Sequence, residues 1–331
     1  MRNGLPFFVQ SNLSDAGPEK GIHMKEEEPI LIMGTGALAG LFAARLAGAG
    51  RDVTILGSWP AGLQALRENG IRLLEADGRE CSYPVMATGC PAQAGLVRHV
   101  LVLVKSWQTA RAAVQLTDCL APDGLAVTLQ NGVGNREILV QALGASRVAV
   151  GVTTTGANLL APGHVQAAGS GVISLGAHPR LSPLWRALRQ AGFVLESSSD
   201  VEALLWGKIV INAAINPITA LLDISNGQLL EIQPARDLVS DIAREAAAVA
   251  VALGIHLPYP DPQVAMEAVA RRTAANRSSM LQDIQRGAPT EIDAICGAIV
   301  RAGEQTGVST PLSRTLWQLV RARVEATSSQ N

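Results

Sequence analysis

A short apolar run that ends in a glycine-rich turn restricts the fold of this chain more than any other feature. Residues 30–33 are apolar, GlyThrGlyAlaLeuAlaGly follows at residues 34–40, and a helical pattern continues to Gly50. Residues 53–56 then form a second apolar run. The order strand, glycine turn, helix, strand predicts a βαβ unit of the length that dinucleotide-binding folds use.

The small residues of this turn have separate expected roles. Gly34 makes the tight turn, Gly36 lets a pyrophosphate approach the backbone, and Ala39 allows the helix to pack closely on the sheet. The phosphates would lie at the helix N-terminus, where free amides and the helix dipole favour anions. The alternative is an ordinary glycine-rich turn. The candidate cofactor-binding residues of this segment are Gly34, Thr35, Gly36, Ala37, Leu38 and Ala39.

The end of the second predicted strand normally distinguishes NAD from NADP. An acidic residue there binds the ribose hydroxyl, whereas a basic residue accommodates the extra phosphate of NADP. Residues 56–60 carry neither charge. We expect NADPH, because no acid repels the phosphate and Ser58 could donate to it, although the missing basic residue leaves NADH open as the alternative. Arg67 could reach the site, but a solvated helix arginine is its default role.

Polar residues follow two further apolar runs, at residues 100–104 and 125–129. Lys105 directly follows the first run, and Gln130 and Asn131 directly follow the second. Because ligands bind outside the carboxyl ends of parallel strands, Lys105 and Asn131 are candidates for cofactor or substrate binding. Either could instead cap a helix or a turn. Further strands are expected at 148–152 and within 164–175, as an antiparallel pair that closes the sheet, with His164 in a turn.

The pattern changes to helices almost throughout from about residue 199. The expected fold class is therefore α/β, with an N-terminal Rossmann-type dinucleotide-binding domain at 29–198 followed by an all-helical C-terminal domain at 199–331 that contributes substrate and catalytic residues. Residues 1–28 are expected to be a disordered leader. The alanine-rich helices at 234–253 and 260–274 are candidates for a homodimer interface. Helices are expected at 201–222, 234–253, 260–274, 291–306 and 311–325.

A polar stripe lies in the first of these helices. Lys208, Asn212 and Asn216 recur every fourth residue in an otherwise apolar segment, so they share one helix face. Burying an amine and two amides is costly unless each finds a partner, so such a stripe usually faces a ligand cleft, where the lysine can donate a proton. The alternative is that the three bind backbone carbonyls or make a polar contact between packed helices.

A second polar cluster covers residues 277–284 and 289–293. Ser278 and Ser279 could cap the helix that follows, or Ser279 could bind a carboxylate. Thr290 resembles a helix start with acids in the first turn. Glu291 could instead point inward and accept a hydrogen bond from a substrate hydroxyl.

Composition narrows the class of partner. A net charge of −1 over 331 residues gives no electrostatic footprint for nucleic acid or an anionic membrane. The four cysteines have no CxxC spacing and no nearby histidines, so no metal site is expected. We therefore expect a soluble, cytoplasmic protein whose partner is a small molecule.

The order of these motifs resembles the ketopantoate reductase (2-dehydropantoate 2-reductase) family over residues 29 to about 325. The glycine motif is generic, whereas the Lys-Asn-Asn helix and the SerSerMetLeuGlnAsp segment with its downstream ThrGlu are specific to that family. The motifs that carry the resemblance are GlyThrGlyAlaLeuAla, ValLysSerTrpGln, GlnAsnGlyValGlyAsn, TrpGlyLysIleValIleAsnAlaAlaIleAsnProIleThrAla, SerSerMetLeuGlnAspIle and ThrGluIleAsp.

The resemblance implies NADPH-dependent reduction of the keto acid ketopantoate to pantoate, on the route to pantothenate and coenzyme A. Lys208 would be the general acid, and Glu291 the acid near the lysine and the substrate hydroxyl. The family often has an arginine at the position of Ser58, so this departure concerns the cofactor preference. The alternatives are a reductase of another 2-keto acid or a non-catalytic NADP-binding sensor. Substrate binding would involve Asn131, Asn212, Asn216 and Ser279, and cofactor binding would include Ser58, Lys105 and Asn131.

Overall fold

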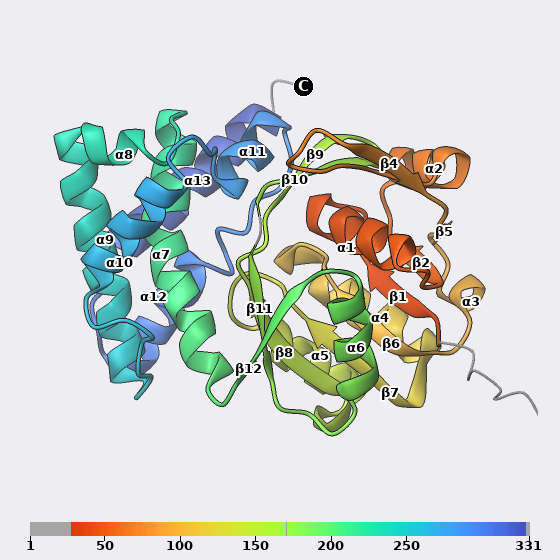
Figure 1. The fold of residues 1–331 in the computed structure, drawn as a ribbon. Helices are drawn as coiled ribbons and strands as arrows, with labels where there is room; N and C mark the ends of the chain where they lie inside the picture. Colours follow the sequence, from red (N-terminus) through yellow and green to blue (C-terminus); the bar gives the residue numbers. More distant parts are fainter. Residues whose placement is uncertain (1–27, 170, 329–331) are drawn as a thin grey trace, which may run out of the picture.

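The structure, a computed structural model, describes residues 28–169 and 171–328. The expected leader at 1–28 lies outside the described residues, apart from Glu28. Figure 1 shows two halves side by side, a sheet with helices on its faces and a group of helices. The α/β fold class expected from the sequence is confirmed.

The first half is built on an eight-stranded sheet in the order β12-β11-β8-β7-β6-β1-β2-β5. Neighbouring strands run parallel, except that β11 is antiparallel to β8. The strands are β1 (Ile30–Met33), β2 (Val53–Leu56), β5 (Met86–Thr88), β6 (Val97–Val102), β7 (Leu120–Thr128), β8 (Val148–Thr153), β11 (Val172–Gly176) and β12 (Val194–Ser198).

The central strands are apolar at successive positions because both faces of the sheet are covered. In β1, Ile30 and Ile32 pack into one core, while Leu31 and Met33 pack into another. Successive side chains point to opposite faces, so a strand buried on both sides needs a continuous apolar run. The helices of this half are α1 (Ala37–Gly48) and α6 (Ser182–Gln190) over the first core, α4 (Thr109–Cys119) and α5 (Asn135–Leu143) over the second, and α2 (Pro60–Asn69) and α3 (Pro91–Ala94) near the β5 edge.

A second sheet covers the outer side of α1 (Figure 1). Its order is β4 (Glu80–Tyr83), β3 (Ile71–Leu74), β10 (His164–Ala167) and β9 (Ala157–Ala161). The expectation for residues 164–175 is therefore corrected, since only β11 joins β8, and His164 begins a strand. In both β10 and β11, partly buried residues alternate with buried ones, so the periodicity of this segment does not show that the two strands belong to different sheets.

The second half consists of helices around α7. By length and composition α7 is the one helix among the described residues that could cross a membrane, and 72% of its apolar window is buried inside the protein. It contacts α9, α10, α11 and α13, and also strand β8 of the sheet. The helices are α7 (Val201–Leu222), α8 (Gln228–Glu231), α9 (Gln233–Ala252), α10 (Pro262–Arg272), α11 (Ser279–Gln285), α12 (Cys296–Thr306) and α13 (Pro311–Ser328).

The helix expected at 291–306 begins later, at Cys296. Residues 291–295 form turns instead. The carbonyl of Ala294 accepts a hydrogen bond from the Val133 amide at 3.3 Å, and the Glu291 carboxylate accepts one from the Ser106 amide. This segment thus binds the sheet half, and the expected role of Thr290 as a helix start is wrong.

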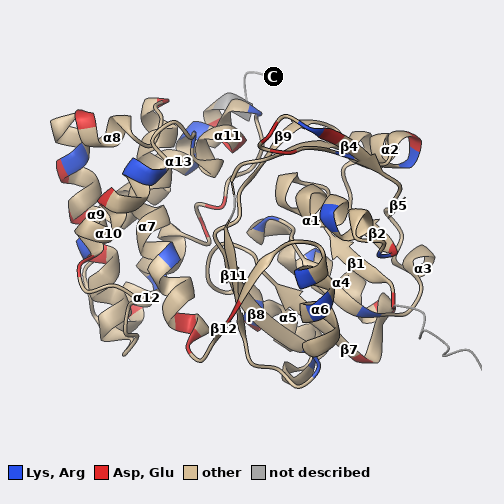
Figure 2. Ribbon diagram, in the orientation of Figure 1, with Lys and Arg blue, Asp and Glu red and all other residues tan. Residues whose placement is uncertain are grey.

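Charged positions are interspersed rather than segregated. Figure 2 shows both acidic and basic residues on α9 and α10, whereas few charged residues lie on the strands of the central sheet. Charged side chains of the sheet half are thus found mainly on its helices and loops.

Candidate active site

A cleft of about 590 Å³ lies where the carboxyl edge of the sheet meets the helical half. Its walls include the glycine turn after β1, the residues that follow β2, β6 and β7, and the end of β8. The helical half adds Lys208 of α7, three residues of α11, and Arg286, Ala288, Pro289 and Glu291 from the segment that follows α11. This volume is typical of a site for a small molecule or cofactor.

The glycine turn leaves the N-terminus of α1 open to this cleft. Gly34 has φ +124°, and a Cβ there would lie 3.1 Å from the carbonyl oxygen of Leu103. At Gly36 a Cβ would meet nothing within 4 Å, and no side chain caps the helix. The first turn contains no acidic residue. These features fit a dinucleotide pyrophosphate, because backbone amides at a helix N-terminus bind anions.

The other residues of the predicted cofactor segment divide between the cleft and the core. Thr35, Ala37 and Leu38 line the cleft together with Gly34 and Gly36. Ala39 is fully buried in the core between α1 and the sheet. Its expected role in close helix packing agrees with this position.

Lys208 reaches from α7 to the edge of the sheet. Its Nζ donates a hydrogen bond to the carbonyl oxygen of Thr153, the last residue of β8, at 2.6 Å. Burial lowers the pKa of Lys208 to about 8, although the negative charge of Glu291 opposes this shift. An amine with such a pKa is still mainly protonated at neutral pH, and it gives up its proton more readily than an ordinary lysine.

Glu291 is held by groups from the sheet half. The residue is 5% exposed, and its carboxylate accepts hydrogen bonds from the Ser106 amide at 3.1 Å and from Asn131 Nδ2 at 3.3 Å. The two segments approach closely at Gly132, which has φ +86° and whose Cβ would lie 2.6 Å from that of Ala294. A larger residue at 132 would separate Asn131 from Glu291.

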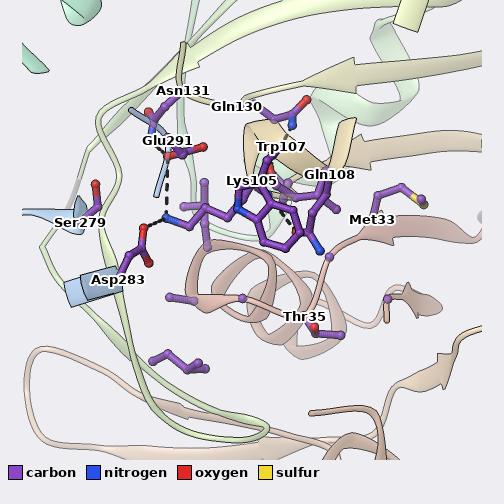
Figure 3. Close-up of a pocket in the computed structure, with 18 of the residues that line it drawn as sticks. Met33, Thr35, Lys105, Trp107, Gln108, Gln130, Asn131, Ser279, Asp283 and Glu291 are labelled. Atoms are coloured by element: carbon purple, nitrogen blue, oxygen red, sulfur yellow. Dashed lines mark hydrogen bonds and ion pairs between the residues drawn. The ribbon is translucent and has the colours of Figure 1, made fainter. Parts of the chain in front are cut away.

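Lys105 joins two carboxylates of the helical half (Figure 3). Its Nζ lies 2.7 Å from Asp283 Oδ2 and 3.7 Å from Glu291 Oε2. Burial acts to lower the pKa of Lys105, but Glu291 and Asp283 outweigh it, so the pKa is raised. Arg286 also pairs with Asp283, at 2.8 Å. Lys105 therefore stays charged and links the two halves across the cleft.

Ser58 lies at the other end of the cleft, after β2. Its hydroxyl accepts a hydrogen bond from Arg111 of α4, which also lines the cleft. Arg67 is used elsewhere, because its Nε donates to the carbonyl of Ala87 at 2.8 Å and it does not line the cleft. The basic side chain next to Ser58 is therefore Arg111 and not Arg67.

Comparison with known proteins gives matches along most of the chain. The family model described as "Ketopantoate reductase PanE/ApbA" matches residues 30–180, and its C-terminal counterpart matches residues 200–324. The 2-dehydropantoate 2-reductase of Archaeoglobus fulgidus is 38% identical over 297 residues, which cover 88% of this chain and 96% of that protein. The chain belongs to the ketopantoate reductase family.

Solved structures agree with this assignment. A PanE/ApbA family ketopantoate reductase from Ralstonia eutropha superimposes with a TM-score of 0.85 at 32% identity, covering 91% of this chain and 99% of that one. A D-mandelate dehydrogenase solved with NADH and anilino(oxo)acetate gives a TM-score of 0.84 at 26% identity, covering 90% and 98%. The expected enzyme class, an oxidoreductase acting on CH–OH groups with a nicotinamide cofactor, is confirmed for this ketopantoate reductase family member.

Two of the predicted substrate residues are not among those that line the cleft. Lys208, Asn131, Ser279 and Glu291 line it together, but Asn212 and Asn216 do not. Asn212 is half-buried and Asn216 is 7% exposed. At 1.5 Å per residue they lie about 6 and 12 Å further along α7 than Lys208.

Sequence reasoning missed three contributors to this ketopantoate reductase site. Asp283 follows Ser279 by one helical turn, so the spacing carried a signal for a shared face. Thr153 contributes a backbone carbonyl, which no residue type reveals. Arg111 reaches Ser58 across 53 positions of sequence, which local patterns do not encode. No group of three or more His, Cys, Asp or Glu among residues 28–169 and 171–328 is placed to hold a metal ion.

Proposed function

We propose that this chain reduces ketopantoate to pantoate with NADPH, in pantothenate biosynthesis, and that Lys208 is the general acid. The observation that carries the proposal is the half-buried Lys208 side chain, which lines a cleft that also contains the glycine turn. The family membership and the relatives named 2-dehydropantoate 2-reductase support ketopantoate as the substrate.

The chemistry requires a proton donor beside the carbonyl oxygen. A bound nicotinamide would supply the hydride. Negative charge develops on the ketone oxygen as the carbonyl is reduced, and a positioned ammonium stabilises this charge and then protonates it. Lys208 has three N–H donors, and one of them is occupied by the Thr153 carbonyl. Among the described residues, no other acceptor is hydrogen-bonded to this amine, so its other two N–H groups can face a substrate. The pKa of about 8 keeps the amine protonated at neutral pH.

The remaining polar groups would position the substrate and hold the charge state of Lys208. Asn131 and Ser279 line the cleft and are proposed to bind the keto acid. Glu291 raises the pKa of Lys208 and so favours its protonated form. Binding by Asn212 and Asn216 stays a prediction from the family pattern.

A second candidate is the reduction of another 2-keto acid on the same scaffold. The resemblance to a D-mandelate dehydrogenase favours it, because that protein shares the fold at a TM-score of 0.84 and was solved with an oxoacetate compound. Comparison of kcat/KM for ketopantoate with kcat/KM for an aryl 2-keto acid separates the two candidates. A much higher value for the aryl compound would favour the second.

The test of the general acid is Lys208→Ala. Loss of a general acid lowers turnover by roughly 10²–10⁴-fold. We therefore expect kcat for NADPH oxidation with ketopantoate to fall by about that factor, while the dissociation constant for NADPH, measured by calorimetry, changes little. A Lys208→Ala protein that binds NADPH and keeps wild-type kcat would remove Lys208 from the mechanism.

A further inference from the structure

Arg111 is a cation that lines the cleft beside Ser58, and no acidic side chain among the described residues pairs with it. It is the third residue of α4, it is exposed, and it lines the cleft. Its guanidinium donates to the neutral Ser58 hydroxyl, and the described part of the chain records no carboxylate paired with it. The guanidinium therefore has donors to spare for a ligand.

The position of Arg111 on its helix favours an anion beside it. The N-terminus of a helix carries a partial positive charge, so a cation in the first turn is unfavourable unless an anion neutralises it. The first turn of α4 contains no acidic residue. A ligand with negative charge would relieve this repulsion and gain a charge-assisted hydrogen bond.

The place where Arg111 acts is the end of β2. In dinucleotide folds the residues there contact the adenosine ribose, and a nearby arginine accommodates a 2′-phosphate. Ser58 occupies this place, and its hydroxyl is held by Arg111. Arg67, the other basic residue considered for this role, donates to the Ala87 carbonyl instead.

We propose that Arg111 supplies, from α4, the positive charge that binds the 2′-phosphate of NADP next to Ser58, and thereby sets a preference for NADP over NAD. This inference rests on the proposed use of the cleft by a nicotinamide cofactor. The charge comes from a different element than the end of β2, where the family often has its arginine. Arg111 is thus a specificity-determining residue for the cofactor.

The test is the affinity of the full chain for nucleotides that differ only in this phosphate. Calorimetry would measure NADP⁺ against NAD⁺, and adenosine 2′,5′-bisphosphate against 5′-AMP. A hydrogen bond to a charged group corresponds to a change of roughly ten- to a hundredfold in affinity. Arg111→Gln should weaken NADP⁺ and the bisphosphate by about this factor and leave NAD⁺ and 5′-AMP unchanged. Arg111→Lys, which keeps the charge, should retain part of the preference.

The matched control is Arg136→Gln. Arg136 is also an exposed arginine near a helix start, on α5, but it does not line the cleft. Arg136→Gln removes the same charge as Arg111→Gln, but at a position outside the cleft. Its affinity for NADP⁺ should therefore equal that of the wild type. The inference would be overturned if Arg111→Gln bound NADP⁺ as tightly as the wild type does. It would also be overturned if the wild type bound NAD⁺ as tightly as NADP⁺. Because these measurements need no turnover, a protein that reduces no keto acid would still report on Arg111.

Discussion

The amine of Lys208 has a pKa near neutrality because burial and a carboxylate act on it in opposite directions. Burial disfavours the ammonium form, and the charge of Glu291 favours it. The net result, a pKa of about 8, places the lysine where it is protonated at neutral pH but still acidic enough to donate. Lys105, which lies beside two carboxylates, has its pKa raised instead. Two lysines in one cleft therefore have different electrostatic properties.

Replacing Glu291 by Gln should move the pH dependence of catalysis. A general acid must be protonated, so kcat/KM of the wild type should be level below pH 8 and fall as the pH rises above about 8. Glu291→Gln removes the charge that raises the pKa of Lys208, so the descending limb should shift to lower pH. The measurement is kcat/KM for ketopantoate as a function of pH.

The control for this prediction is Asp293→Asn. Asp293 lies two residues from Glu291, but it accepts a hydrogen bond from Trp317 Nε1 at 2.6 Å and does not line the cleft. The descending limb of kcat/KM against pH in Asp293→Asn should coincide with that of the wild type. A limb that stays in place in Glu291→Gln would mean that Glu291 does not set the pKa of Lys208.

At the scale of elements, α11 is a short helix whose start is fixed by Ser278. The Ser278 hydroxyl accepts from the Leu281 amide at 3.1 Å and from the Thr219 hydroxyl at 2.7 Å, so it caps α11 and ties it to α7. Ser279 and Asp283 then face the cleft. The sequence left open which of the two serines caps the helix, and the structure assigns the cap to Ser278.

Loss of this cap should affect stability and substrate binding together. Ser278→Ala should lower the free energy of unfolding by about 0.5–2 kcal/mol, the usual effect of removing an N-cap, and should raise KM for the keto acid because α11 positions Ser279. Urea denaturation and steady-state kinetics would measure the two effects. Asp261→Ala removes the cap of α10, which does not line the cleft, so it should lower stability similarly without changing KM. Unchanged KM in Ser278→Ala would separate α11 from substrate binding.

The elements that could be predicted from sequence are those with a sustained local pattern. An apolar run predicts the β1 strand, the small residues after it predict the glycine turn, and the spacing of apolar residues predicts α7. The turns at 291–295 could not be predicted, because they depend on the Ala294 carbonyl binding Val133 and on Glu291 binding Ser106. The second sheet was missed for the same reason, since β10 pairs with β3 across more than ninety positions of sequence.

At the scale of the whole molecule, the site exists only because the two halves meet. Lys105 and Asn131 come from the sheet half, while Lys208, Asp283 and Glu291 come from the helical half. Sequence patterns placed Lys105 and Asn131 at strand ends and Lys208 on a helix face, but no local rule gives their pairing. The contacts across the cleft therefore position the residues of the site and also help to hold the two halves together.

Lys105→Met should weaken that cohesion. Removing one partner of a fully buried ion pair costs roughly 3–5 kcal/mol, because the other charge stays buried. The side chain of Lys105 is 34% exposed and that of Asp283 is 3% exposed, so we expect a smaller loss in the free energy of unfolding, about 2 kcal/mol at pH 7.

The pKa of Lys105 is raised above 10.5 in the fold, so its stabilisation is fully present below pH 10.5 and is lost as the pH rises through the folded pKa. Urea denaturation would measure the loss, with Arg136→Met as the control, since its exposed pair with Glu137 at 4.0 Å should change stability by no more than about 0.5 kcal/mol. A loss in Lys105→Met no larger than that of the control would mean that this ion pair does not help to hold the two halves together.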